Sequence, residues 1–238
     1  MGKRHRQNEY AGVVQKLEER NVPQKREVTI FRDGSAKDKV EEKIPLRTFP
    51  IMIGVPMDEV MFSQFFLLFM RNIHPMPWDG FTATTSTYLP EARNKVHNEF
   101  LDAKQYDWLF MLDSDVICPP HTVERLLARQ LPIVAGYYVS KSPLKENCPV
   151  VYDFLKEDNG FFEWTHRAKP GEGLEKVGGV GMGCVMMSRE VAEKLGRDPY
   201  NMNHGGEDLE MCKKLMELDI PLYVDWNINC SHLGIKWY

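Results

Sequence analysis

The sequence lacks a long apolar run and has no recognisable secretory leader. Its most apolar stretch, residues 60–70, contains Ser63 and Gln64 and is shorter than the ~20 residues that a membrane-spanning helix needs. The first eight residues are basic, but no apolar segment follows them, as a signal peptide would require. We therefore expect no membrane span and a cytoplasmic protein, with residues 60–70 forming a core helix.

Cysteine is scarce and follows no pattern that would bind a metal or build a disulfide framework. The sequence has no C-x-x-C pair and no zinc-like spacing, and its cysteines are odd in number: Cys118, Cys148, Cys184, Cys212 and Cys230. This usage is typical of reduced thiols in a cytosol, most of them packed as small apolar side chains.

Neither sign of charge dominates, since 34 acidic and 30 basic residues give a formal net charge of −4. A protein that coats nucleic acid or a membrane surface would be more basic, although local basic contacts to a phosphate stay open. There is no internal repeat or low-complexity tract. The 238 residues suit one large α/β domain, with two small domains as the less favoured alternative.

The first 48 residues are polar and charged, and we interpret them as an appendage to a domain formed by residues 49–238. Within this appendage, residues 10–19 could form a helix, and residues 28–31 resemble a strand followed by a turn, half of a small hairpin. The charge run over residues 37–43 favours a solvated linker.

From residue 49 onward, apolar strand patterns alternate with helical ones. Strands are expected at 49–56, 81–85, 108–112 and 131–138, with helices at 61–70, 90–103 and from Pro119 onward. This alternation predicts a Rossmann-like, mostly parallel sheet with right-handed crossovers. Further along, short strands at 150–154, 160–164 and 174–177 predict a small antiparallel patch. A short helix at 189–195, a helix from 205 to about 218 and a strand at 222–226 complete the pattern.

The stretch from Trp108 to Asp115 organises the domain. Five apolar residues, typical of a strand buried on both faces, run directly into Asp113-Ser114-Asp115. Ionised carboxylates are costly to bury unless they are paired or bind a metal, and ligands bind at the carboxyl ends of strands in open α/β sheets. Two carboxylates there could hold Mg²⁺ or Mn²⁺ together with a diphosphate. Aspartate is also common in turns for backbone reasons alone.

Two later segments supply further candidate side chains. Gly205-Gly206-Glu207-Asp208 opens a helix, so Asp208 or Glu207 could face a cleft and accept a proton, although acids are favoured at helix N-termini by the dipole alone. His232 could be a metal ligand, with His204 as a rival and a hydrogen-bonded loop histidine as the alternative.

The glycine-rich stretch over residues 178–183 lacks both the G-x-G-x-x-G context and a P-loop lysine. It favours a flexible loop that admits a substrate, or a plain set of turns, over a phosphate cradle. Arg93 and Lys141 stand near strand ends, where either could face a diphosphate or simply be a solvated surface charge.

Taken in order, these segments resemble a GT-A-fold glycosyltransferase of the broad class that includes family 2 enzymes. The resemblance spans roughly residues 49–234. It is carried by the strand at 51–56, Ala92-Arg93-Asn94, Leu112 to Asp115, Gly181 to Val191, and the C-terminal segments. The segments from Gly205 to Glu210 and from Cys230 to Gly234 are also similar to the polypeptide N-acetylgalactosaminyltransferases.

The resemblance implies a metal-dependent transfer of a sugar from a nucleoside-diphosphate donor, most simply a UDP-sugar, to an acceptor hydroxyl. It implies Mn²⁺ or Mg²⁺ on Asp113, Asp115 and His232. It also implies that Asp208, with Glu207 beside it, acts as the general base of an inverting enzyme. The residues expected near the donor or the acceptor floor are Pro56, Arg93, Asp113, Ser114, Lys141, Gly181 and Gly183. Many relatives continue beyond the position of Tyr238, so an oligomer or a partner protein could complete the open C-terminal side.

The sequence leaves three alternatives to an inverting glycosyltransferase open. A retaining glycosyltransferase of the same fold would use Asp208 only to position the acceptor. A non-catalytic module that binds a nucleotide sugar or glycan is a second alternative, which the intact carboxylates disfavour. A nucleotidyltransferase is a third, and the segment Val55 to Glu59 disfavours it because it lacks a glycine-rich, basic loop after the first strand.

Overall fold

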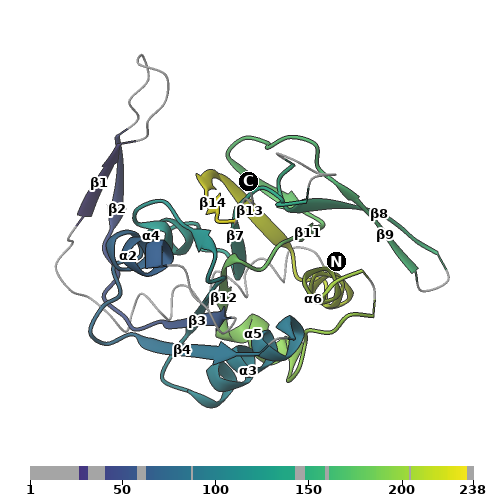
Figure 1. The fold of residues 1–238 in the computed structure, drawn as a ribbon, viewed down its shortest axis with the longest axis horizontal. Coiled ribbons are helices and arrows are strands. Elements are labelled where there is room, and N and C mark those ends of the chain that lie inside the picture. The colour runs from purple at the N-terminus through teal and green to yellow at the C-terminus, as the bar shows by residue number, and fades with distance from the viewer. Residues whose placement is uncertain are drawn as a thin grey trace, which may run out of the picture.

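The computed structural model describes residues 27–31, 41–57, 63–86, 88–142, 148–158, 161–203 and 205–234. The expected helix at 10–19 and the rival histidine His204 lie outside these residues. At the centre is a seven-stranded sheet with the order β10-β13-β7-β12-β5-β3-β4 (Figure 1). Its strands are β3 (Met52–Met57), β4 (Gly80–Thr85), β5 (Trp108–Leu112), β7 (Ile133–Tyr137), β10 (Leu174–Val177), β12 (Cys184–Ser188) and β13 (Leu222–Asn229).

The protein is mixed α/β, and its central sheet is mostly parallel, as predicted. β4, β3 and β5 pair in parallel, as the alternation of strand and helix patterns predicts. β7 does not pair with β5, however, because β12 lies between them and runs antiparallel to both. All five residues of β12 are buried, so this apolar segment takes a central place in the sheet. Its insertion brings the glycine-rich segment next to the end of β5.

Helices cover both faces of the sheet, and the strands alternate their side chains between two cores. On one face, α3 (Leu89–Asp102), α5 (Arg189–Leu195) and α6 (Glu207–Glu217) pack on Met52, Leu109 and Met111. On the other, α2 (Ser63–Asn72) and α4 (Thr122–Leu127) pack on Ile53 and Phe110. Each central strand is thus buried on both faces, which is why its sequence is continuously apolar.

Helix α3 lies unusually close to β3, and this contact positions Arg93. A Cβ at Gly54 would lie 2.1 Å from Val96 Cγ1, so only glycine permits this approach of helix to strand. Pro90 stands in the first turn of α3, where its missing N–H is not needed. Val96 and Phe100 face the sheet, and Arg93, one turn earlier, is carried to the sheet's carboxyl edge.

Smaller sheets lie around the central one. β11 (Gly179–Val180), β8 (Val151–Asp158) and β9 (Phe161–His166) form one, β14 (Ser231–His232) and β6 (Val116–Ile117) another. The prediction of an antiparallel patch is confirmed for β8 and β9, but the expected third strand, 174–177, is wrong in its placement. As β10 it pairs with β13 at the edge of the central sheet, where its alternating exposed and buried residues suit an edge.

The charged N-terminal part contains a hairpin, β1 (Glu27–Phe31) with β2 (Glu41–Pro45) (Figure 1). The expected linker over 37–43 is therefore wrong at its C-terminal end, because main-chain pairing of a hairpin does not require apolar side chains. Arg47, which follows, bonds both carboxylate oxygens of Asp79. The division at residue 48 stays a prediction.

Among the residues described, no helix is both long and apolar enough to cross a membrane. The most apolar helix, α2, buries Phe65 and Phe69 against the sheet and leaves Phe66 and Leu67 exposed. The helix expected within residues 60–70 is confirmed from Ser63 onward, residues 60–62 lying outside the described residues, but it is half-exposed and not a core helix.

Candidate active site

Arg93 and Asp113 form the centre of the site. The Arg93 side chain is only 1% exposed, and its Nη1 and Nη2 donate to Oδ1 and Oδ2 of Asp113 at 2.8 and 3.0 Å. Its Nε lies 3.4 Å from Glu207 Oε1 and 3.5 Å from Asp208 Oδ1. One buried guanidinium from α3 therefore binds three acids that come from the ends of β5 and the start of α6. Although burial opposes its charge, Asp113, Asp208 and Glu207 raise the pKa of Arg93 well above its ordinary value.

Asp208 is the acid in this group whose protonation is most perturbed. Burial raises the pKa of its carboxyl to about 7, assisted by the charges of Glu207 and Asp113 and opposed by Arg93. Its side chain is 21% exposed, and Oδ1 has no hydrogen-bond partner among the described residues. A carboxyl that titrates near neutrality at an accessible position can accept a proton from a bound hydroxyl.

The loop before Asp208 adopts a conformation that glycine favours. Gly205 and Gly206 have φ of +100° and +139°, values that other residues rarely adopt. This backbone turns the chain from the preceding loop into α6, so that Glu207 and Asp208 stand at its first turn. The local sequence therefore accounts for the placement of both acids.

Asp115 lies in a second group with Lys141 and His232. The pairing of β6 with β14 sets His232 opposite Val116, and Leu233 N donates to Asp115 O at 2.7 Å. Lys141 Nζ bonds Asp115 Oδ2, and His232 Nε2 lies 3.6 Å from Asp115 Oδ1. Burial would raise the pKa of Asp115, but the bonds from His232 and Lys141 outweigh it and lower this pKa to about 2. Asp115 is therefore ionised at any physiological pH.

The donor atoms of this second group suit a divalent cation. His232 Nδ1 lies 2.9 Å from the carbonyl oxygen of Val139, so Nδ1 donates there, and Nε2, which faces Asp115, is the ring atom left to bind a metal. A carboxylate with an imidazole is a ligand set for a transition ion such as Mn²⁺, with the remaining positions open to diphosphate oxygens. Asp115 and His232 thus fit the expected metal.

Asp113, the third expected ligand, is placed differently. Its carboxylate faces Arg93 with both oxygens. Within the described residues, three ligand atoms come within 4.8 Å of one another only in a cysteine cluster, not in Asp113, Asp115 and His232. A cation held by Asp115 and His232 would gain Asp113 only if that carboxylate turned away from Arg93.

Gly181 and Gly183, which were predicted to lie near the site, are in close contact with Asp113 and Tyr138. Asp113 N donates to Gly183 O at 3.1 Å, and a Cβ at Gly183 would lie 2.7 Å from Asp113 Oδ2. A Cβ at Gly181 would lie 2.2 Å from the hydroxyl of Tyr138. The glycines are needed because Asp113 and Tyr138 pack directly on this backbone.

Two other predicted residues are less closely tied to the acids. Ser114 is half-buried between Asp113 and Asp115. Pro56 is buried in β3. It lies two residues beyond Gly54, and Gly54 is the last residue of β3 that pairs with β5.

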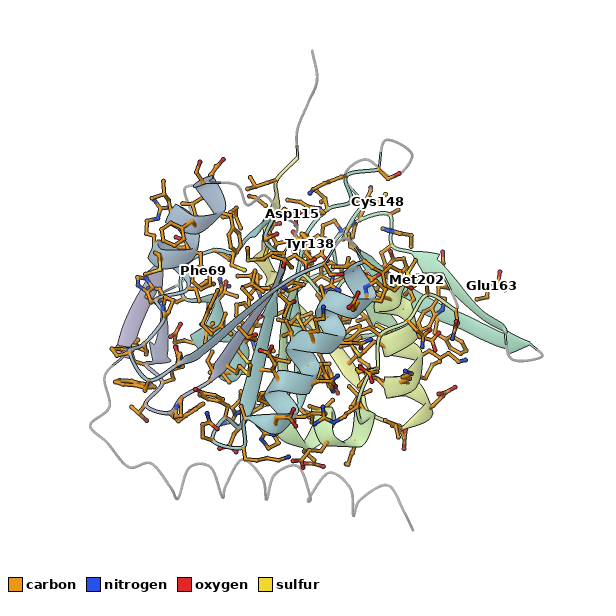
Figure 2. The ribbon with its side chains drawn as sticks, turned by 60° about the horizontal axis from the view of Figure 1, so that its bottom comes forward. Phe69, Asp115, Tyr138, Cys148, Glu163 and Met202 are labelled. Carbon is orange, nitrogen blue, oxygen red and sulfur yellow. The ribbon has the colours of Figure 1, made fainter. Side chains whose placement is uncertain are left out.

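Sequence reasoning did not identify two tyrosines of the site. Tyr138 follows β7, its hydroxyl accepts from Gly183 N at 3.1 Å, and its ring packs edge-on against His232 at 4.9 Å. Figure 2 places Tyr138 beside Asp115 at the same end of the molecule. Tyr200 is buried near Arg93, and its main chain exchanges hydrogen bonds with the side chain of Asn94. Tyr138 could have been found from its position at a strand end, whereas no local signal marks Tyr200.

Comparison with known proteins supports the fold and not a family. No protein-family model and no curated protein matches the sequence. Among solved structures, A197 from STIV matches with a TM-score of 0.56 and 20% identity, over 79% of this chain and 87% of that one. GalNAc-T7, solved with UDP, GalNAc and Mn²⁺, matches with a TM-score of 0.52 and 11% identity, over 78% of this chain. The match spans 44% of the GalNAc-T7 chain. The protein therefore has a GT-A-like α/β fold, shared in part with a glycosyltransferase.

Proposed function

We propose that the protein is a metal-dependent glycosyltransferase that moves a sugar from a nucleoside-diphosphate donor to an acceptor hydroxyl. One observation carries the proposal: Asp208, a carboxyl that titrates near neutrality, lies beside the Arg93–Asp113 pair at the edge of the sheet where β5 ends. This edge is where open α/β sheets bind ligands. The presence of UDP, GalNAc and Mn²⁺ in a protein of similar fold makes a UDP-sugar our first choice of donor.

Asp115 and His232 would hold the cation, which when bound neutralises charge on the departing diphosphate. Mn²⁺ fits an imidazole ligand better than Mg²⁺ does. Lys141, now bonded to Asp115, would contact the diphosphate. Ser114 and Pro56 would line the donor side, and Gly181 and Gly183 the acceptor side.

Asp208 would act as the general base. Its ionised carboxylate removes the proton from the acceptor hydroxyl as that oxygen attacks the anomeric carbon, which gives an inverted product. Burial and the neighbouring acids raise the pKa of Asp208 to about 7, so this carboxyl can gain and lose a proton near neutral pH. If Asp208 only positions the acceptor, the reaction would retain configuration. We propose that the enzyme acts in the cytoplasm, in keeping with its five free cysteines.

A donor panel tests the proposal. The protein is heated with UDP-, GDP-, dTDP- and CMP-sugars, with and without Mn²⁺, and release of the nucleoside diphosphate is measured in parallel. We expect a rise in melting temperature that needs both Mn²⁺ and one nucleotide, with slow hydrolysis of that sugar nucleotide. No metal-dependent shift with any donor would contradict the proposal.

The variant Asp208→Asn separates an enzyme from a binding module. It should keep the donor-dependent thermal shift and lose turnover by roughly 10²–10⁴-fold, the usual contribution of a general base. Asp102→Asn is the matched control, because Asp102 is an exposed acid on α3 that pairs only with Arg197 in the described structure. Unchanged turnover in Asp208→Asn would exclude Asp208 as the base.

A further inference from the structure

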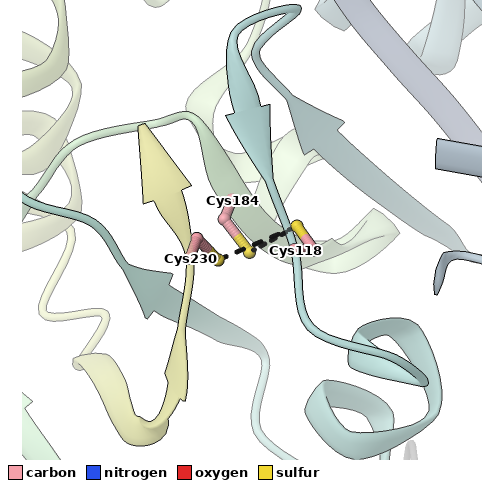
Figure 3. A group of neighbouring side chains, drawn as sticks. All are labelled: Cys118, Cys184 and Cys230. Carbon is pink, nitrogen blue, oxygen red and sulfur yellow. Dashed lines mark hydrogen bonds between the residues drawn. The ribbon is translucent and has the colours of Figure 1, made fainter. Parts of the chain in front are cut away.

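Three cysteines that are far apart in the sequence meet inside the protein. Cys118 Sγ lies 3.6 Å from Cys184 Sγ and 3.8 Å from Cys230 Sγ, and all three sulfur atoms lie within 4.8 Å of one another. Their exposed fractions are 3%, 0% and 3%. Figure 3 shows the three side chains converging from separate segments. The sequence predicted no such group, because the spacing of the three residues follows no metal-binding pattern.

From this geometry we propose that Cys118, Cys184 and Cys230 form a structural site for a soft divalent cation, Zn²⁺ being the first choice. With Zn–S bonds of about 2.3 Å, tetrahedral geometry sets sulfur atoms about 3.8 Å apart. The two measured separations match this spacing. On binding, each thiol would release its proton to solvent as its S–Zn bond forms.

The backbone around the three sulfurs is held in place by hydrogen bonds. Asn72 Nδ2 donates to Cys118 O at 2.7 Å, and Cys230 N donates to Tyr137 O at 2.7 Å. Cys184 is the first residue of β12, paired with Leu112. The three ligands are therefore presented by rigid elements, as a preorganised metal site requires.

The charges nearby suit a divalent ion. Three thiolates and Zn²⁺ carry a net charge of −1, and the positive charge of Arg125 acts on Cys230. Arg125 Nη2 is held by the carbonyl oxygen of Asn227 at 2.7 Å. The negative charge of Asp113 acts on Cys184, but Arg93 compensates it. A monovalent ion would leave one more negative charge buried, which is costly.

Gly136 permits close packing beside the cluster. A Cβ at this position would lie 2.9 Å from Cys184 Sγ and 2.6 Å from Ile228 Cγ2. The glycine thus allows the sulfur to lie against the backbone of β7.

The cluster joins the segments that carry the candidate active site. Cys118 follows Asp115 by three residues, Cys184 follows Gly183 directly, and Cys230 precedes His232 by two. A cation bound to the three sulfurs would therefore hold these loops in one geometry. This proposal does not depend on the proposed glycosyl transfer, since its test measures metal binding and stability.

The first test uses the native chain. The protein is refolded with Zn²⁺ or Cd²⁺, dialysed, and analysed for bound metal and for the thiolate-to-cadmium charge-transfer band. We expect about one ion per chain, a higher melting temperature and a band intensity of three thiolates. In alkylation under mildly denaturing conditions, where the buried thiols become reachable without metal, the ion should protect Cys118, Cys184 and Cys230 while Cys148 still reacts. No charge-transfer band, or equal alkylation with and without metal, would overturn the proposal.

Variants then locate the site. Cys184→Ser should lose most of the charge-transfer band and the metal-dependent rise in melting temperature. Cys212→Ser is the matched control, because Cys212 is equally buried but lies outside the cluster and donates to Val180 O. His232→Ala should leave the cadmium band unchanged, which distinguishes this site from the cation proposed at Asp115. A band that survives Cys184→Ser at full intensity would contradict the assignment.

Discussion

Arg93 holds Asp113 through two parallel hydrogen bonds of 2.8 and 3.0 Å, and the guanidinium is shielded from solvent. This geometry is the strong, bidentate form of an arginine–carboxylate pair. It sets the electrostatics of the whole site, because the same guanidinium also neutralises Glu207 and Asp208. One buried cation therefore holds the three carboxylates together.

Replacing Arg93 should destabilise the protein strongly. Arg93→Met leaves three acids without their counter-charge, so the free energy of unfolding should fall by about 3–5 kcal/mol, measured by chemical denaturation. The free energy of unfolding of Arg93→Lys should lie between those of Arg93→Met and the native protein, because a lysine keeps the charge and loses the bidentate bonds. The control Arg197→Met removes an exposed pair with Asp102 and should cost less than about 1 kcal/mol. A loss below about 1 kcal/mol for Arg93→Met would contradict the structure of this site.

The raised pKa of Asp208 predicts how stability depends on pH. Its pKa is about 7 in the folded protein and near 3.9 in an unfolded chain. A raised carboxyl pKa stabilises the fold fully below the unfolded value, and that contribution disappears as pH rises through the folded value. Relative to Asp208→Asn, the native protein should therefore lose stability between about pH 4 and pH 7. Denaturation of the native protein and Asp208→Asn across this pH range measures the difference. The native protein and the control Asp102→Asn should show the same dependence of stability on pH.

Removing His232 should weaken the proposed cation site without unfolding the protein. In His232→Ala, the affinity for Mn²⁺ in the presence of UDP should fall roughly tenfold or more, measured by calorimetry. His166→Ala is a suitable control, since His166 belongs to β9, away from Asp115. Equal Mn²⁺ affinity in native protein and His232→Ala would show that the cation binds elsewhere.

Adding a methyl group at Gly183 should disturb the site sterically. The new Cβ would lie 2.7 Å from Asp113 Oδ2 and 2.9 Å from the Tyr138 hydroxyl. Gly183→Ala should therefore cost about 1–3 kcal/mol of stability and reduce donor binding. Gly234→Ala is the control, because there the nearest atom, Lys141 Cδ, lies at an ordinary 3.7 Å. Native-like stability and donor binding in Gly183→Ala would contradict the close packing.

Several features of the fold could be predicted because they depend on residues close together in the chain. The apolar run of residues 108–112 forms β5 with the predicted bounds, since a segment without polar side chains must be buried on both faces. The parallel pairing of β3, β4 and β5 follows from the alternation of strand and helix patterns. The pattern after residue 150 was weaker, and there the placement of β10 was wrong.

That acids follow the end of a core strand, and that two glycines precede Asp208, can be read directly from the chain. The partners of these acids depend on tertiary packing, because Arg93 and Asp113 meet through the packing of α3 on β3, and β12 enters the sheet between β5 and β7. The same insertion brings Cys184 to Cys118 and Cys230. Such contacts join residues far apart in the chain, so burial and strand register determine them and no local pattern encodes them.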